Sequence, residues 1–149
     1  MIIPIASDHA GYKAKEQVKK VLEALGHMPV DFGTHDENSV DYPDYAKTVA
    51  SSISDKEFEK GILVCGSGQG MCISANKFSG VRAALAWTPE IADLSVKHNN
   101  SNVLCLPGRF VTDEELAEIV KTWIESEFEG GRHERRVNKI QQKDKDIDD

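Results

Sequence analysis

The sequence predicts a three-layer, Rossmann-like α/β fold in which a five-stranded parallel sheet lies between helices. Short apolar segments alternate with amphipathic ones along the 149 residues, as they do in chains built from β-α-β units. Some apolar segments are continuous, which is typical of strands buried on both faces of a parallel sheet. Neither an internal repeat nor a linker divides the sequence. We therefore expect one domain over residues 1–149, with a frayed acidic tail at about 143–149.

Five segments in the first half of the chain have the pattern of a strand or a helix. Gly26 fits the C′ position of the first helix, and Gly33 ends the second strand. A polar loop is expected between residues 34 and 43. In order, the predicted elements are a strand at 2–6, a helix at 12–25, a strand at 28–32, a helix at about 44–53 and a strand at 62–65.

The second half continues the alternation and contains clear helix starts. Thr88 and Pro89 supply a capping threonine followed by proline at the first helical position. Thr112 and Glu115 have the spacing of a capping box. The predicted elements are a helix after Gly70, a strand at 81–87, a helix at 90–97, a strand at 102–106, a helix from about 112 to 128 and a basic helix from Arg132 that we expect to extend to a partner subunit.

The overall charge argues against two classes of binding partner. The chain has 18 basic and 25 acidic residues and a net charge of −7, which argues against general binding to nucleic acids or membrane surfaces. No apolar run approaches the length of a membrane span, and no charged region precedes the first apolar segment. These features predict a cytoplasmic protein.

The cysteines and histidines suggest neither disulfides nor a metal site. Cys65, Cys72 and Cys105 include no pair with CxxC spacing. Cys72 and Cys105 lie in apolar segments, and we expect both to be packing residues. The five histidines show no metal-ligand spacing.

The most informative segment is the glycine-rich turn after the third strand. The strand ends at Cys65, and Gly66-Ser67-Gly68-Gln69-Gly70 leads into a helix. Such a turn exposes backbone N–H groups and the positive end of a helix dipole, which stabilise negative charge and favour a thiolate at Cys65. Two alternatives stay open. Cys65 is a small buried hydrophobe, or the turn binds a nucleotide, although it matches neither GxGxxG nor a P-loop.

Ligands of open parallel sheets bind beyond the carboxyl ends of the strands. Asp8 and His9 follow the first strand and Cys65 follows the third, so neighbouring strands would bring them together. Arg109, just past the fifth strand, reaches the same edge. His98 precedes the fifth strand and belongs to the opposite edge. It is either a surface histidine or part of a site on another subunit.

Arg132 and Arg136 are four residues apart and share one helix face. Two guanidinium groups on one face suit a phosphate or a carboxylate. The alternative is an ordinary solvated face.

Taken together, these residues resemble the type B ribose-5-phosphate isomerases, in the wider family that includes the galactose-6-phosphate isomerase subunits. The resemblance covers nearly the whole chain. The matching segments are Ser7-Asp8-His9-Ala10-Gly11, Asp41-Tyr42-Pro43, residues 65–70, Ala75-Asn76-Lys77, Arg82-Ala83, His98-Asn99, Asn102-Val103-Leu104 and Glu129-Gly130-Gly131-Arg132-His133.

The resemblance implies a cofactor-free aldose–ketose isomerase of the pentose phosphate pathway that interconverts ribose 5-phosphate and ribulose 5-phosphate. Cys65 would be the base, the amides around Gly66, Gly68 and Gly70 with the Ser67 hydroxyl would hold the enediolate, and His98 would open the sugar ring. The remaining positions would bind substrate: Asp8, Tyr42 and Asn99 the hydroxyls, and His9, Arg109, Arg132 and Arg136 the phosphate. The resemblance also implies a homodimer whose active sites combine residues of both subunits, or a dimer of such dimers.

Two departures from the family pattern matter. Some members use a glutamate six residues after the cysteine position, where this chain has Met71, so the base assignment falls on Cys65. Ser67 stands where many members have threonine, which keeps the hydroxyl. The alternatives are an isomerase of allose or galactose 6-phosphate and a non-catalytic module that binds a sugar phosphate or a nucleotide.

Overall fold

The computed structural model describes residues 1–140, which form five strands and six helices. The predicted frayed tail at about 143–149 lies outside the described residues. The strands are β1 (Ile2–Ser7), β2 (Met28–Asp31), β3 (Gly61–Cys65), β4 (Ala83–Leu85) and β5 (Val103–Pro107). The helices are α1 (Tyr12–Ala24), α2 (Tyr42–Ser54), α3 (Gln69–Ala75), α4 (Pro89–Lys97), α5 (Asp113–Glu125) and α6 (Arg132–Ile140).

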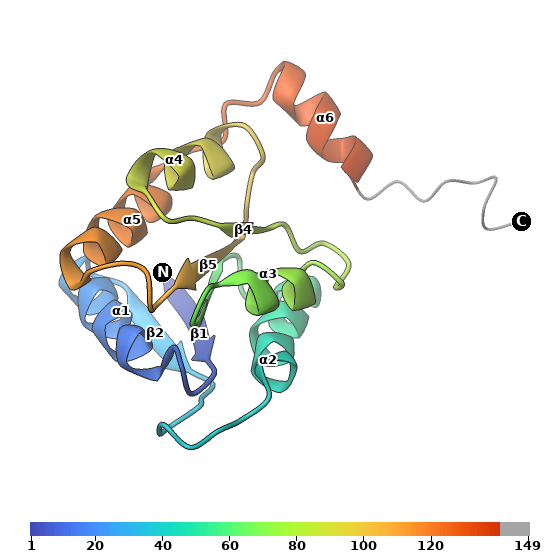
Figure 1. Ribbon diagram of the computed structural model, residues 1–149. Helices are drawn as coiled ribbons and strands as arrows, with labels where there is room; N and C mark the ends of the chain where they lie inside the picture. Colours follow the sequence, from blue (N-terminus) through green and yellow to red (C-terminus); the bar gives the residue numbers. More distant parts are fainter. Residues whose placement is uncertain (141–149) are drawn as a thin grey trace, which may run out of the picture.

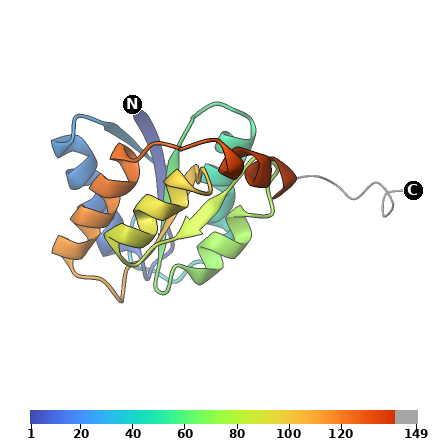
Figure 2. The same ribbon diagram turned by 90° about the horizontal axis from the view of Figure 1, so that it is seen from above.

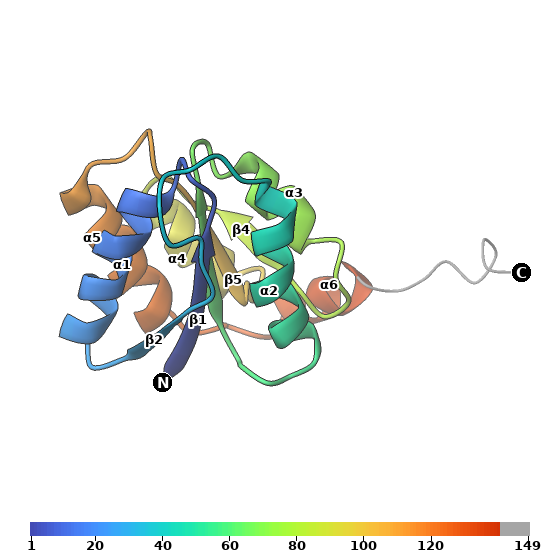
Figure 3. The ribbon, with the colours of Figure 1, turned by 90° about the horizontal axis from the view of Figure 1, so that it is seen from below.

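The five strands form one parallel sheet in the order β2-β1-β3-β5-β4. Helices α1, α4 and α5 cover one face and α2 and α3 cover the other, so three layers are visible in Figure 3. The predicted three-layer α/β fold is confirmed. Because all strands run the same way, the loops after β1, β3 and β5 meet at one edge of the sheet, which we call the carboxyl edge.

Alternation along β3 decides which layer each of its side chains faces. Ile62 and Val64 belong to the core under α1, α4 and α5, whereas Leu63 and Cys65 belong to the core under α2 and α3. Successive side chains of a strand point to opposite faces. Cys65 therefore ends β3 on the side of α2 and α3, beneath the turn that connects β3 to α3.

Helix α2, strand β4 and helix α5 differ from their predicted boundaries by two residues or more. Helix α2 begins at Tyr42, two residues early, because Asp41 takes the N-cap and Pro43 fits the first turn. Strand β4 is shorter than expected, since Asn102 and Asn76 side chains accept the N–H groups of Arg82 and Ala83. Helix α5 ends at Glu125 rather than 128.

A buried lysine ties α1 to the loop after β2. Lys15 is fully buried, and its Nζ donates to Asp31 Oδ1 and to the Thr34 carbonyl, both at 2.6 Å. Burial raises the pKa of Asp31, but hydrogen bonds from Lys15, Lys19 and the Gly33 N–H outweigh it, and the net pKa lies below its usual value. The loop that leads to α2 is thus held against the body of the protein.

The chain leaves the three layers after α5. Gly130 and Gly131 both have positive φ, at 71° and 58°, a backbone conformation that other residues rarely adopt. The chain then enters α6, in which no residue is buried. Figure 1 shows α6 set apart from the rest of the molecule, and Figure 2 shows the connection from α5 to it from above. Among the helices of residues 1–140, none combines the length and apolar character needed to cross a bilayer.

Candidate active site

Close backbone contacts build the carboxyl edge around Cys65. The Asp8 N–H donates to the Val64 carbonyl at 3.3 Å, and the Asp8 carboxylate accepts the Gly11 N–H at 2.9 Å. A Cβ on Gly11 would lie 2.9 Å from the Cys65 nitrogen. Only glycine therefore lets the loop after β1 approach β3 so closely. The turn that carries Asp8 and His9 is fixed directly against the cysteine.

The glycine-rich turn lies between β3 and α3 as predicted, but α3 already begins at Gln69, inside the predicted 66–70 turn. Gly68 is the N-cap of α3 with a φ of 78°, and the Ser67 hydroxyl oxygen accepts the Gln69 N–H at 3.3 Å. The Cys65 and Gly66 carbonyls accept the N–H groups of Gly108 and Arg109, which follow β5. The backbone of the turn is therefore held by its neighbours, a condition for a preorganised anion site.

Burial governs the ionisation of Cys65, which is only 5% exposed. It raises the pKa of the thiol, and the Asp8 carboxylate adds to this. The N–H groups of Met71, Gly68 and Ser67 lower the pKa but do not overcome the desolvation. The N–H groups of the turn act in the expected direction, but desolvation has the larger effect on the pKa of Cys65. The net pKa of the Cys65 thiol in the free protein lies above its ordinary value.

Further predicted residues surround the turn at this edge. Tyr42 packs on Gly70, since a Cβ there would lie 2.7 Å from its ring, and the Arg109 side chain lies 3.3 Å from the corresponding position on Gly66. His9 Nδ1 accepts the Val40 N–H at 3.1 Å, which leaves the other ring nitrogen for a ligand. The structure thus joins Asp8, His9, Tyr42, the 65–70 turn and Arg109, as the strand order predicts.

Four predicted site residues lie away from the carboxyl edge of the sheet. His98 and Asn99 follow α4, which runs antiparallel to the strands, and they belong to the edge opposite Cys65. Arg132 and Arg136 lie on α6, beyond the same edge, and both are exposed. Within one chain the site therefore separates into two groups, as the position of His98 before β5 indicates.

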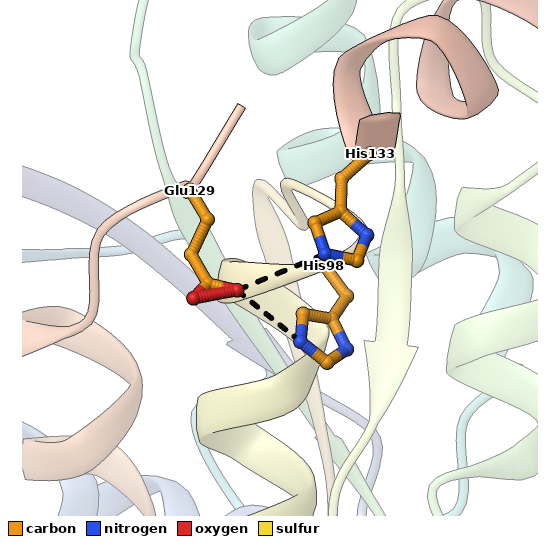
Figure 4. A group of neighbouring side chains, drawn as sticks. All are labelled: His98, Glu129 and His133. Atoms are coloured by element: carbon orange, nitrogen blue, oxygen red, sulfur yellow. Dashed lines mark ion pairs between the residues drawn. The ribbon is translucent and has the colours of Figure 1, made fainter. Parts of the chain in front are cut away.

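The sequence analysis assigned no role to Glu129 and His133, whose side chains contact His98. His98 and His133 stack with ring centroids 4.2 Å apart and planes 10° apart. Glu129 Oε1 lies 3.3 Å from His98 Nε2 and 3.8 Å from His133 Nε2, as Figure 4 shows. The four-residue spacing of Glu129 and His133 was the available signal, but nothing local connects that pair to His98.

These three side chains offer ligand atoms within 4.8 Å of one another, although the histidine spacing indicated no metal site. A metal ion binds in the plane of an imidazole ring, at about 2.1 Å from its nitrogen. Two parallel, stacked rings cannot both direct a nitrogen lone pair at one ion. As arranged, the cluster does not fit a metal.

The comparisons with known proteins agree with this geometry. Residues 3–140 match the family model described as Ribose/Galactose Isomerase. The chain belongs to this family. The probable ribose-5-phosphate isomerase B of Mycoplasma genitalium is 47% identical over 141 residues, which cover 91% of each chain.

Two solved structures of the family extend the comparison to the fold. The ribose 5-phosphate isomerase of Thermotoga maritima is 52% identical, with a TM-score of 0.91 over 93% of this chain and 96% of that one. Ribose-5-phosphate isomerase B of Mycoplasma genitalium with bound ribulose-5-phosphate is 44% identical, with a TM-score of 0.89 over 93% of each chain.

Proposed function

We propose that this protein interconverts D-ribose 5-phosphate and D-ribulose 5-phosphate without a cofactor. The observation that carries the proposal is the placement of a buried cysteine beneath a turn of backbone N–H donors at the carboxyl edge of the sheet. The full-length similarity to ribose-5-phosphate isomerases, one of them with bound ribulose-5-phosphate, supports the same substrate pair.

The isomerisation needs one proton to move between adjacent carbons. The Cys65 thiolate takes the proton from C2 of the open-chain aldose, and the electron pair passes to the carbonyl oxygen to give an enediolate. A proton then moves from the C2 hydroxyl to O1, and the protonated Cys65 delivers its proton to C1, which leaves the carbonyl at C2. The N–H groups of the 66–70 turn and the Ser67 hydroxyl stabilise the developing oxyanion.

The free-enzyme thiol must lose its proton before this step. Burial opposes ionisation, and the N–H groups of the turn partly compensate. A bound phosphate and sugar displace water and fix the reacting carbon next to the sulfur. The proposed contacts assign the hydroxyls to Asp8, Tyr42 and Asn99, and the phosphate to His9, Arg109, Arg132 and Arg136.

His98 opens the furanose ring in this proposal, so it must reach the substrate held by Cys65. Within one chain the two residues lie at opposite edges of the sheet. A homodimer resolves this if His98, Asn99, Arg132 and Arg136 complete the site of the partner subunit. The unburied helix α6 supports the idea, because it extends from the body with its Arg132 and Arg136 side chains exposed. A dimer of dimers is compatible with the same sharing.

The first test is ribulose 5-phosphate formation from ribose 5-phosphate by wild type and Cys65→Ala, with a chelator present. The matched control is Cys72→Ala, which removes a half-buried thiol from the neighbouring helix α3. We expect turnover in wild type and Cys72→Ala and a loss of at least about a hundredfold in Cys65→Ala. Turnover that survives in Cys65→Ala would refute the mechanism. A wild type inactive on ribose 5-phosphate but active on allose or galactose 6-phosphate would refute the substrate, and inactivity on all of them would favour a binding module.

A further inference from the structure

The cluster of His98, Glu129 and His133 is built by three separate features of the chain. His98 is the C-cap of α4, His133 lies in the first turn of α6, and Glu129 lies in the connection between α5 and α6. The Glu129 N–H donates to the Lys97 carbonyl at 3.1 Å, at the end of α4. This hydrogen bond holds Glu129 beside His98.

The two glycines then turn the chain back over the cluster. Gly130 and Gly131 have positive φ, and the His133 N–H donates to the Gly130 carbonyl at 3.1 Å. The turn brings His133, which is only 12% exposed, onto the ring of His98, which is 41% exposed. One face of the His98 ring is therefore covered, and one nitrogen is directed at a carboxylate.

A carboxylate beside one imidazole nitrogen decides which nitrogen carries the proton. Glu129 Oε1 lies 3.3 Å from Nε2 and favours the tautomer in which Nε2 carries the proton, so neutral His98 keeps its lone pair on Nδ1. Stacking against His133 keeps the ring from rotating about its bond to Cβ. The cluster thus fixes both the tautomer and the plane of His98.

Other charged groups also face the cluster. Burial lowers the pKa of His133, and the nearby His98, Arg132 and Arg136 add to this against Glu129. A neutral His133 can stack on His98 without the repulsion of a second positive charge. The remaining charged neighbours are Asp93 and Lys97 on α4.

We propose that Glu129 and His133 are positioning residues that hold His98 as a ring-opening base with its lone pair on Nδ1. The inference rests on the proposed function. Nδ1 takes the proton of the anomeric hydroxyl, and the C1–O1 bond becomes a double bond as the bond from C1 to the ring oxygen breaks. The ring oxygen takes a proton from a water molecule, and that water regains one from the His98 imidazolium. Neither positioning residue touches the reacting atoms.

The test separates ring opening from proton transfer. Ribulose 5-phosphate has no free 5-hydroxyl and cannot form a furanose, so it enters the site in the open-chain form. Exchange of its C1 proton with deuterated solvent needs Cys65 but not ring opening. Conversion of ribose 5-phosphate needs both steps, and the ratio of the two rates isolates the role of His98.

We expect Glu129→Ala and His133→Ala to slow conversion of ribose 5-phosphate by about tenfold or more while C1 exchange stays within about twofold of wild type. Two conservative variants should rescue conversion. Glu129→Gln keeps an oxygen that accepts from Nε2, and His133→Phe keeps a flat ring to stack on. Nitrogen-15 NMR of the His98 ring should show the proton on Nε2 in wild type and Glu129→Gln, and a mixture in Glu129→Ala.

Equal losses of conversion and exchange in the alanine variants would overturn the proposal and show a structural role. An unchanged His98 tautomer in Glu129→Ala, or no rescue by Glu129→Gln, would also overturn it. Zinc that co-purifies with wild type and is lost in all four variants would favour a metal site instead. A wild type that neither converts nor exchanges would refute the proposed function, which is a separate outcome.

Discussion

The two edges of the sheet hold their chemical groups in different ways. At the carboxyl edge, Cys65 is buried, and the turn around it is hydrogen-bonded to the loops after β1 and β5. At the opposite edge, His98 and Glu129 are both about half exposed, and α6 buries none of its residues. Sheet topology alone organises the first edge. Within residues 1–140, the groups at the second edge are present but remain partly exposed, which is compatible with the proposed sharing of the site between two subunits.

The largest loss of activity is expected from a side chain placed in the narrow space between the loop after β1 and strand β3. Gly11→Ala places a Cβ 2.9 Å from the Cys65 nitrogen and closer still to the Val64 carbonyl. Both neighbours are backbone and cannot move aside cheaply. We expect kcat/KM to fall by at least about a hundredfold, because displacement near 1 Å at a reacting group costs that much. A folded Gly11→Ala with wild-type kinetics would show that this edge is not rigid.

Substitution of the buried Lys15 tests how much its hydrogen bonds at this edge contribute to the free energy of unfolding. Lys15→Ala leaves Asp31 and the Thr34 carbonyl without their shared donor, and we expect the free energy of unfolding in urea to fall by about 3 kcal/mol. Lys19→Ala is the matched control, since Lys19 also pairs with Asp31 but is partly exposed. A loss from Lys15→Ala no greater than that from Lys19→Ala would contradict the account.

Alkylation compares two thiols only seven positions apart. A hydrogen bond from Cys105 lowers the pKa of Cys72 to about 7, whereas burial raises that of Cys65. The reactive thiolate of Cys65 should therefore increase about tenfold per pH unit between pH 7 and 8, while that of Cys72 approaches its plateau. Mass spectrometry of peptides after brief iodoacetamide treatment resolves the two sites. A pH-independent alkylation rate at Cys65 would mean that the N–H groups of the turn lower its pKa by more than burial raises it.

The smallest loss of activity is expected from a substitution at the edge opposite Cys65. Gly131→Ala meets no atom within 4 Å but keeps a φ of 58°, so the cost is strain of about 1 kcal/mol confined to the turn before α6. We expect a severalfold loss of ribose 5-phosphate conversion with an unchanged Tm. A drop in Tm as large as that of Lys15→Ala would show that α6 supports the fold of its own chain.

Much of this arrangement could be predicted from the sequence. The apolar run that ends at Cys65 and the glycines after it define the β3-to-α3 turn locally, and the strand order then brings Asp8 and Arg109 to it. The contact of His98 with Glu129 and His133 could not be found this way, because it depends on how far the chain travels after α5. The pKa of Cys65 was missed because desolvation depends on packing by distant residues rather than on the turn itself.

In the proposed homodimer, one active site combines Cys65 of one subunit with His98 of the other. Cys65→Ala and His98→Ala chains, each inactive alone, should be mixed, and subunit exchange followed by native mass spectrometry of isotope-labelled chains. In a two-fold dimer, random exchange makes half of the dimers mixed, each with one intact site of two, so about a quarter of wild-type turnover should return. Complete exchange without recovered activity would contradict the shared site.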